Sequence, residues 1–141
     1  MSLPVKTWYS PNDSHQKFLA VVLSYGLSKK LNRRSFEAVN ESHIDIFDFE
    51  SEIADVVVYD INNSYKPALI VEFCREEEIQ STLRSVEIIA EIYGIKESFV
   101  HNTTSGVWYK ISSKTTTFTS DSTLFMLSLQ QLFSHSLENY F

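Results

Sequence analysis

Residues 54–73, with the sequence ADVVVYDINNSYKPALIVEF, contain two apolar runs separated by a turn. The runs are Ala54–Asp60 and Ala68–Phe73, and both are rich in the β-branched and aromatic residues that strands favour. Turn-forming residues, Asn62–Ser64, lie between them, and Pro67 follows. Because the connection is short, the sequence predicts two neighbouring antiparallel strands joined as a hairpin.

Each of these two strands carries one carboxylate among core-type residues. Asp55 stands at the start of the first strand and Glu72 near the end of the second. Since strand side chains alternate between the faces of a sheet, Asp55 shares a face with Val57 and Tyr59, and Glu72 shares one with Ile70. The hairpin can bring both carboxylates together at one end, where they repel each other unless protons or a cation neutralise them. Carboxylate oxygens suit Mg²⁺ or Mn²⁺, so one interpretation is a divalent-metal site. The other is a pair of acids in salt bridges at the sheet edge.

The rest of the chain shows helical and extended patterns around this hairpin. Helices are predicted at Ser14–Leu31, Glu77–Tyr93 and Thr123–Asn139, and further strands at Arg34–Val39, Ser42–Glu50, Ser98–His101, Val107–Ile111 and Thr115–Phe118. Gly94 is expected to end the second helix, and Asp121 or Ser122 to begin the third. A change of hydrophobic phase within Ser42–Glu50 indicates a bulge. The order α-β-β-β-α-β-β-α predicts an α/β fold with a mixed central β-sheet flanked by helices.

Length and charge limit the function classes. The chain has 141 residues, so we expect residues 1–141 to form a single domain. Its net charge of -6 repels nucleic acid, and contact with DNA requires a local basic patch. Lys29, Lys30, Arg33 and Arg34 form such a cluster. Cations at the end of a helix also complement its dipole, which is the alternative interpretation of this cluster.

Cysteine content and apolar runs exclude several further classes. Cys74 is the single cysteine, which rules out an internal disulfide and a cysteine zinc site. No run approaches the about 20 apolar residues of a membrane helix. Met1–Asn12 has no apolar run of the secretory type, so we expect a cytoplasmic protein without membrane contact. No motif indicates a small-molecule cofactor.

Three stretches carry a resemblance to a known family. Ser10–Gln16 resembles the "SP…H" segment, Ala54–Asp60 the "PDVVV" strand, and Pro67–Phe73 the "P-x-LVVEV" strand of the Uma-type family. That family is a branch of the restriction-endonuclease-like proteins, the PD-(D/E)XK nuclease superfamily, and most of its members have no known role. Tyr93–Tyr109 also resembles the nuclease domain of type I restriction subunits. The similarity spans about residues 8–111.

The resemblance implies a restriction-endonuclease-like core and a site for phosphodiester hydrolysis. Asp55 and Glu72 would hold Mg²⁺ or Mn²⁺, and a metal-bound water would attack the phosphodiester. Ala54 replaces the motif proline, which is not a ligand. Cys74 stands where the superfamily usually has a catalytic lysine, and a thiol supplies no permanent positive charge. The alternative interpretation of Cys74 is a small buried residue at the end of a strand.

Other residues are candidates for the role of the missing lysine and for a third metal ligand. Arg84 in the second helix would replace the lysine, with Lys96 a weaker choice; the alternative for Arg84 is a surface pair with Glu87. Arg75 is adjacent but is expected to point to the face opposite Glu72. Glu37 would supply a third acidic ligand.

The remaining polar candidates also have two interpretations each. His15 is a helix-start residue or a general base. His43, His101 and His135 share no ligand spacing, so zinc is not expected. Glu76–Glu78 would stabilise the start of a helix, and it would also oppose the approach of a phosphate.

Two functions from different classes follow. The first is a metal-dependent nuclease acting on DNA. The second is a catalytically inactive nuclease-fold module that binds or interacts through a homodimer surface. Aromatic residues are either core residues or part of an exposed dimer patch that includes the last helix; they are Trp8, Trp108, Phe133, Tyr140 and Phe141.

Overall fold

The structure, a computed structural model, describes the backbone of residues 14–140 and the side chains of residues 15–138. In chain order the elements are α1 (Ser14–Lys30), β1 (Phe36–His43), β2 (Ile53–Asp60), a 3₁₀ turn (Ile61–Asn63), β3 (Lys66–Cys74), a second 3₁₀ turn (Glu76–Glu78), α2 (Ile79–Tyr93), β4 (Glu97–Asn102), β5 (Trp108–Ser112), β6 (Thr115–Thr117), β7 (Asp121–Ser122), β8 (Leu127–Ser128) and α3 (Leu129–Tyr140). The predicted order of helices and strands is confirmed. The strand predicted at Thr115–Phe118 is β6, and the short β7–β8 pair is added before the last helix.

Six strands form one mixed sheet in the order β1-β2-β3-β4-β5-β6. The predicted β2–β3 hairpin is antiparallel, and β3 pairs in parallel with β4. Parallel neighbours need a long crossover, and α2 supplies it. Gly94 ends α2 in the left-handed region, with φ 65°, as expected of a helix C-cap.

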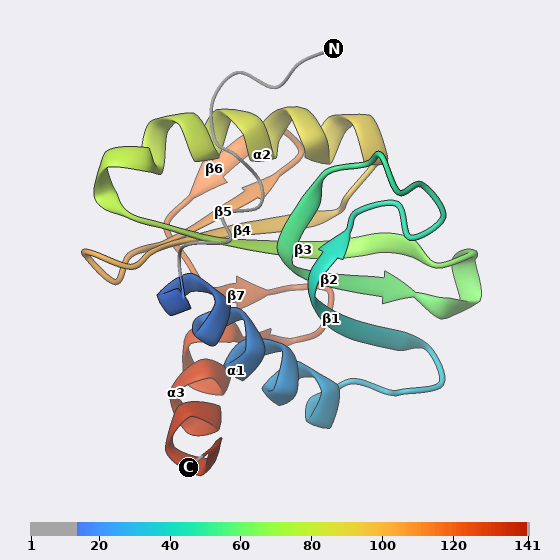
Figure 1. The fold of residues 1–141 in the computed structure, drawn as a ribbon, viewed down its shortest axis with the longest axis horizontal. Coiled ribbons are helices and arrows are strands. Elements are labelled where there is room, and N and C mark those ends of the chain that lie inside the picture. Colours follow the sequence, from blue (N-terminus) through green and yellow to red (C-terminus); the bar gives the residue numbers. More distant parts are fainter. Residues whose placement is uncertain (1–13, 141) are drawn as a thin grey trace.

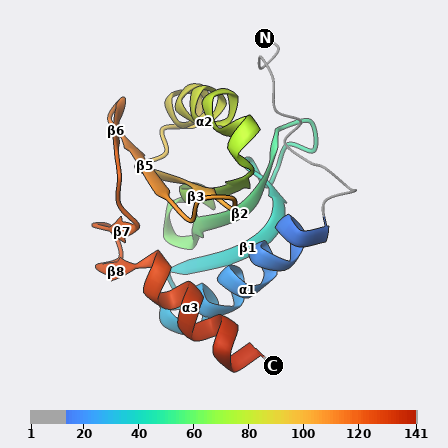
Figure 2. The ribbon, with the colours of Figure 1, turned by 90° about the vertical axis from the view of Figure 1, so that its left-hand side faces the viewer.

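Helices cover both faces of the sheet. Figure 2 shows α2 on one side of the strands and α1 with α3 on the other. In Figure 1, α2 runs along the sheet from the end of β3 toward the start of β4. The mixed α/β architecture predicted from the sequence is therefore confirmed.

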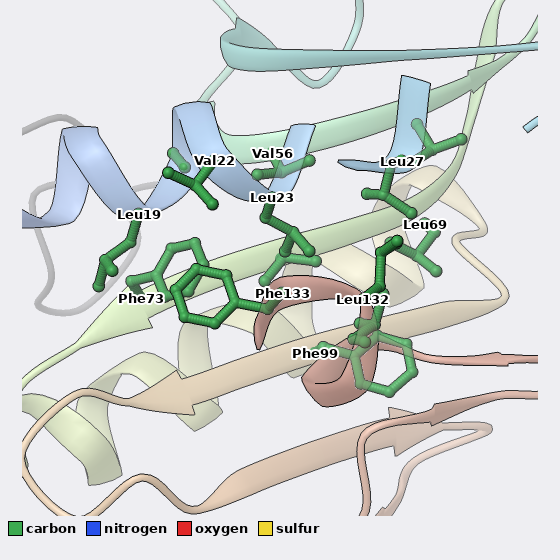
Figure 3. Close-up of a cluster of buried hydrophobic side chains, with 14 of the residues drawn as sticks. Leu19, Val22, Leu23, Leu27, Val56, Leu69, Phe73, Phe99, Leu132 and Phe133 are labelled. Carbon is green, nitrogen blue, oxygen red and sulfur yellow. The ribbon is translucent and has the colours of Figure 1, made fainter. Parts of the chain in front are cut away.

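The larger core lies between the sheet and the α1–α3 layer. Figure 3 shows leucines of α1 above side chains of β2, β3 and β4, with α3 residues closing the cluster. The labelled members are Leu19, Val22, Leu23, Leu27, Val56, Leu69, Phe73, Phe99, Leu132 and Phe133. Leu19 lies beside Phe73 and Leu27 beside Leu69, so the N-terminal end of α1 lies over the end of β3 that carries Glu72.

A second core, on the α2 side, contains Val57 and Tyr59 of β2 and Ile70 and Cys74 of β3. Val57 and Tyr59 of β2 and Ile70 and Cys74 of β3 therefore face α2, as the alternation predicts, and Ala54 of β2 also belongs to this core. Asp55 shares the odd numbering of Val57 and Tyr59, and Glu72 shares the even numbering of Ile70 and Cys74.

The strand predicted at Ser42–Glu50 is wrong beyond His43. Residues 44–52 form a loop instead, because side chains take over the backbone groups that a strand would use. Asp45 Oδ1 accepts a hydrogen bond from Phe47 N at 3.0 Å, and Asp48 Oδ1 accepts one from Glu50 N at 2.9 Å. These local turns compete with a sheet ladder.

The predicted start of the last helix at Thr123 is also wrong. A buried carboxylate from another strand binds this segment: Glu97 Oε2 accepts hydrogen bonds from Thr123 N at 2.7 Å and Leu124 N at 3.1 Å. The helix begins six residues later, where Ser128 Oγ accepts a hydrogen bond from Gln131 N at 3.2 Å, as an N-cap does.

The apolar residues of α3 pack inside the molecule. Leu129, Leu132 and Phe133 are buried, and Trp108 is only 6% exposed. The interpretation of Trp108 and Phe133 as an exposed patch is therefore wrong, while a homodimer remains a prediction. Trp8 and the side chains of Tyr140 and Phe141 lie outside the described residues. No helix within residues 14–140 is long and apolar enough to span a membrane.

Candidate functional site

The two central strands separate at the position of Asp55 and Glu72. The β2–β3 ladder runs up to the pair Val56↔Val71 and has no further pair in that direction. Beyond it, β2 pairs with β1 as far as Ile53, and β3 pairs with β4 as far as Cys74. The backbone groups facing the gap therefore need other partners.

The carboxylates of the two acids provide these partners across the gap. Asp55 N donates a hydrogen bond to Glu72 Oε1 at 2.7 Å, and Phe73 N donates one to Asp55 Oδ2 at 2.7 Å. Each carboxylate is thus fixed by an N–H group of the opposite strand. Glu72 is completely buried and Asp55 is half-buried. The structure brings together the two acids that the sequence singled out.

This arrangement places two carboxyl groups near each other, one of them fully buried. Two neighbouring carboxylates repel each other unless a proton or a cation lies between them. Two acids are also few for a metal site: among residues 14–140, no group of three or more His, Cys, Asp or Glu is arranged to hold an ion. Mg²⁺ is nevertheless commonly held by one or two carboxylates, with water and substrate phosphates completing its shell.

Cys74, at the usual lysine position, is fully buried in the α2-side core with Ile70, Ile79 and Val86. Its carbonyl oxygen accepts hydrogen bonds from Thr103 N at 2.7 Å and from Thr103 Oγ1 at 3.1 Å. The structure therefore shows a packed thiol at this position and no cation.

The basic candidates lie elsewhere. Arg84 is exposed, whereas the residues of α2 that face the sheet are Ile79, Thr82, Ser85, Val86 and Ile89. Lys96 precedes Glu97, which pairs with Leu69, so it lies at the opposite end of β3 from Glu72. Arg75 is exposed and forms ion pairs with Glu77 at 3.4 Å and Glu78 at 3.8 Å.

The other predicted residues are also distant from the acid pair or exposed. Glu37 pairs with Tyr59, four residues from Asp55 and about 13 Å away along β2. His15 is exposed in the first turn of α1, at the end of the helix that lies over the Glu72 end of β3. The structure does not bring Glu37 to the site.

The basic cluster lies at the other end of the sheet. Lys29, Lys30, Arg33 and Arg34 are all exposed at the C-terminal end of α1. Lys29 Nζ stands 4.5 Å from the centre of the Tyr25 ring. Because α1 begins over the Glu72 end of β3, its C-terminal end points away from the acid pair.

A polar network beside the site was not predicted. Asn102 is 1% exposed and pairs with Cys74 across the parallel strands. Its Nδ2 donates to Glu76 Oε2 at 2.5 Å, and its Oδ1 accepts from Thr104 N at 3.0 Å. Thr104 Oγ1 in turn accepts from Glu76 N at 3.1 Å. The network ties the loop after β4 to the segment that follows Glu72. In the sequence, this network is indicated only by Asn102, which stands at the end of a strand just before a turn.

The six-stranded mixed sheet with helices on both faces has the architecture of a restriction-endonuclease-like fold. The chain is similar to the crystal structure of a "putative nuclease belonging to DUF820" from Anabaena variabilis ATCC 29413. The TM-score is 0.56 at 13% sequence identity, and the match covers 96% of this chain and 86% of that chain. At 13% sequence identity, this structural similarity shows that the two chains share a fold. No family model and no curated protein matches the sequence.

Proposed function

We propose that this protein is a metal-dependent nuclease that hydrolyses phosphodiester bonds in DNA. The observation that carries the proposal is the Asp55–Glu72 pair, fixed by reciprocal hydrogen bonds where β2 and β3 separate. The likeness of the fold to a protein described as a nuclease supports it.

The donor set fits Mg²⁺ or Mn²⁺. Glu72 Oε1 and Asp55 Oδ2 accept the backbone hydrogen bonds, and the proposal assigns the cation to this pair of carboxylates. Both are hard oxygen ligands of the kind these cations prefer. A divalent ion held there would supply Lewis acidity toward a phosphoryl oxygen and a more acidic water.

The chain's own residues orient the site. The N–H groups of Asp55 and Phe73 hold the two carboxylates in fixed directions, so little reorganisation is needed when a charged ligand arrives. Burial of Glu72 keeps water away from one side of the pair. Since Arg84 lies on the solvent side of α2, no described residue is assigned the charge-stabilising role of the missing lysine.

A cleavage assay tests the proposal. Asn at position 55 and Gln at position 72 each keep a carbonyl oxygen for the backbone hydrogen bond, so Asp55→Asn and Glu72→Gln preserve the fold better than alanine does. With Mn²⁺, we expect the natural protein to cut supercoiled or single-stranded DNA, and EDTA to stop it. Each variant should cleave DNA at least about 100-fold more slowly than the natural protein. Equal cleavage by all three proteins would contradict the assignment of these residues.

One observation favours a second candidate, a catalytically inactive interaction module. The lysine position is filled by Cys74, buried among apolar side chains. If the natural protein is folded and inactive while Cys74→Lys cleaves DNA in Mn²⁺, the site has lost activity through this residue. Inactivity of Cys74→Lys as well, with the fold intact, would leave the interaction module.

A further inference from the structure

The loop of residues 45–52 presents aromatic side chains to solvent. Phe47 is 74% exposed and Phe49 is 83% exposed. The same eight residues include four acids and no basic residue; the acids are Asp45, Asp48, Glu50 and Glu52. The loop is therefore an apolar surface with a negative rim.

The loop is held in place by its own polar groups. Besides the two Asp turns described above, Ser51 Oγ donates to Asp48 O at 2.7 Å, and Tyr93 Oη donates to Glu52 Oε2 at 3.3 Å. His43 Nδ1 lies 2.8 Å from Ser51 O. An ordered loop that keeps two phenylalanines in water is organised for binding before a partner arrives.

A pocket of about 540 Å³ lies between the end of α1, the β7–β8 turn and α3. Phe125, Leu127 and Leu132 supply its apolar lining, with Lys30 and His135 among the polar residues. Its volume falls in the range of pockets that bind ligands, about 300–1,000 Å³.

The charges of the two surfaces are complementary. Lys30 belongs both to the pocket and to the basic cluster of Lys29, Lys30, Arg33 and Arg34, a stretch that contains no acid. Lys30 thus brings a positive charge to the pocket, at the basic end of α1, and four negative charges rim the loop. Complementary patches steer association and fix its register.

The loop and the pocket cannot meet within one chain. The loop is attached to the end of α2 through Tyr93, whereas the pocket lies in the α1–α3 layer on the other face of the sheet. Figure 2 shows these two layers separated by the strands. A surface and a complementary pocket at different places on one molecule make a head-to-tail contact between copies.

We propose that the protein self-associates head to tail, with the Phe47–Phe49 surface of one copy seated in the Lys30–Leu132 pocket of the next. This inference is independent of the proposed nuclease activity. Each phenylalanine can bury about 150–250 Å². Since a stable interface needs more than about 1,000 Å², the association is weak and concentration-dependent.

Sedimentation velocity of the full chain tests the proposal. From about 5 to 500 µM in 50 mM NaCl, we expect the weight-average mass to rise above the 16.3 kDa of the monomer. Phe47→Ser/Phe49→Ser should remain monomeric. Phe118→Ser is the matched control, because Phe118 is 76% exposed but lies outside both surfaces. Circular dichroism checks that each variant is folded.

Charge exchange tests the pairing of the two surfaces. Glu50→Lys and Lys30→Glu should each associate less than the natural protein when alone and associate when mixed, because the mixture restores opposite charges at both contacts. A natural protein that stays monomeric at 500 µM overturns the proposal. Association that survives Phe47→Ser/Phe49→Ser also overturns it, as does a mixture of the charge variants that does not associate.

Discussion

Asp55 and Glu72 replace a missing segment of backbone pairing. Where β2 and β3 part, each carboxylate accepts the N–H group that the opposite strand would have used in the ladder. A buried acid is costly unless it is hydrogen-bonded. The site is therefore part of the sheet's own hydrogen bonding, which is why conservative variants are the suitable probes of its chemistry.

Glu97 is a second buried acid, and its role is structural. It is 4% exposed and forms an ion pair with Lys110 Nζ at 3.1 Å. Ser122 Oγ also donates to Glu97 Oε1 at 2.6 Å. Burial raises the pKa of Glu97, but the hydrogen bonds from Ser122, Lys110 and the backbone outweigh it, so the net pKa is lowered.

We expect Glu97→Gln to lower the free energy of unfolding by about 3 kcal/mol at pH 7, because it leaves the half-buried Lys110 without its counter-ion. A lowered folded-state pKa stabilises the fold above the unfolded value and loses that effect as the pH falls through the folded one. The difference from the natural protein should therefore shrink in acid. Urea denaturation across pH measures both effects.

The exposed pair Glu91–Lys114, at 3.4 Å, provides the matched control. Its carboxylate and ammonium are both well exposed, so Glu91→Gln should change stability by less than about 1 kcal/mol. Equal losses in Glu91→Gln and Glu97→Gln would show that burial of Glu97 has no energetic consequence.

His101 should make the fold sensitive to mild acid. It is buried against the ring of Trp108, with ring centres 4.5 Å apart, and burial lowers its pKa to about 4. Between about pH 6.5 and 4 the unfolded chain binds a proton at this residue and the folded chain does not. The free energy of unfolding should fall by about 3 kcal/mol across that window.

His101→Leu should remove this part of the pH dependence, because leucine does not titrate. Thermal or urea denaturation at several values from pH 4 to pH 7.5, on both proteins, measures the difference in slope. Parallel curves for the natural protein and His101→Leu would mean that folding does not lower the pKa of His101.

At the scale of elements, α1 and α3 come together at a glycine. A Cβ built at Gly26 would lie 2.1 Å from Ser136 Oγ and 3.2 Å from Leu132 Cγ. Rotation of the serine can relieve the first contact but not the second. The absence of a side chain at this position allows the two helices to approach.

Gly26→Val should therefore destabilise the protein by about 2 kcal/mol or more, since it forces the helices apart. The neighbouring Tyr25→Val, at a 40% exposed position, controls for the helix propensity of valine. Thermal unfolding compares the two. A Gly26→Val protein as stable as Tyr25→Val would contradict the close packing of α1 on α3.

The elements that could be predicted from the sequence are those determined by local patterns. The β2–β3 hairpin and α1 depend on periodicity and turn residues, and their predicted bounds agree with the structure to within about two residues. Residues 44–50, predicted as strand, and 123–128, predicted as helix, were predicted wrongly for two reasons. The first segment is shaped by Asp side chains, and the second by Glu97, which is distant in sequence.

The candidate site also combines features that local sequence patterns predict with features that depend on distant contacts. Asp55 and Glu72 stood out because acids are unusual in apolar strands, and the hairpin register then placed them together. Buried Cys74 and surface-exposed Arg84 were each one of two interpretations, and the choice between them, like the network of Asn102, depends on how α2 and the β4 loop pack. A strand or helix pattern carries no information about that packing.

At the scale of the whole molecule, positive and negative groups are separated. The acid pair lies where the central hairpin opens, and the basic cluster lies at the far end of α1. The chain has a net charge of -6, so the proposed DNA cleavage depends on a cation at the acids to offset the repulsion of phosphates. Cation binding is therefore the first requirement of the proposed function.

Isothermal titration calorimetry with Mn²⁺ tests that requirement directly, because it needs neither DNA nor activity. We expect the natural protein to bind one Mn²⁺ per chain, and Asp55→Asn and Glu72→Gln to lose this binding while keeping their circular dichroism spectra. Glu91→Gln, which changes an exposed acid, should bind as the natural protein does. No detectable Mn²⁺ binding by the folded natural protein, or equal binding by all four proteins, would contradict the account.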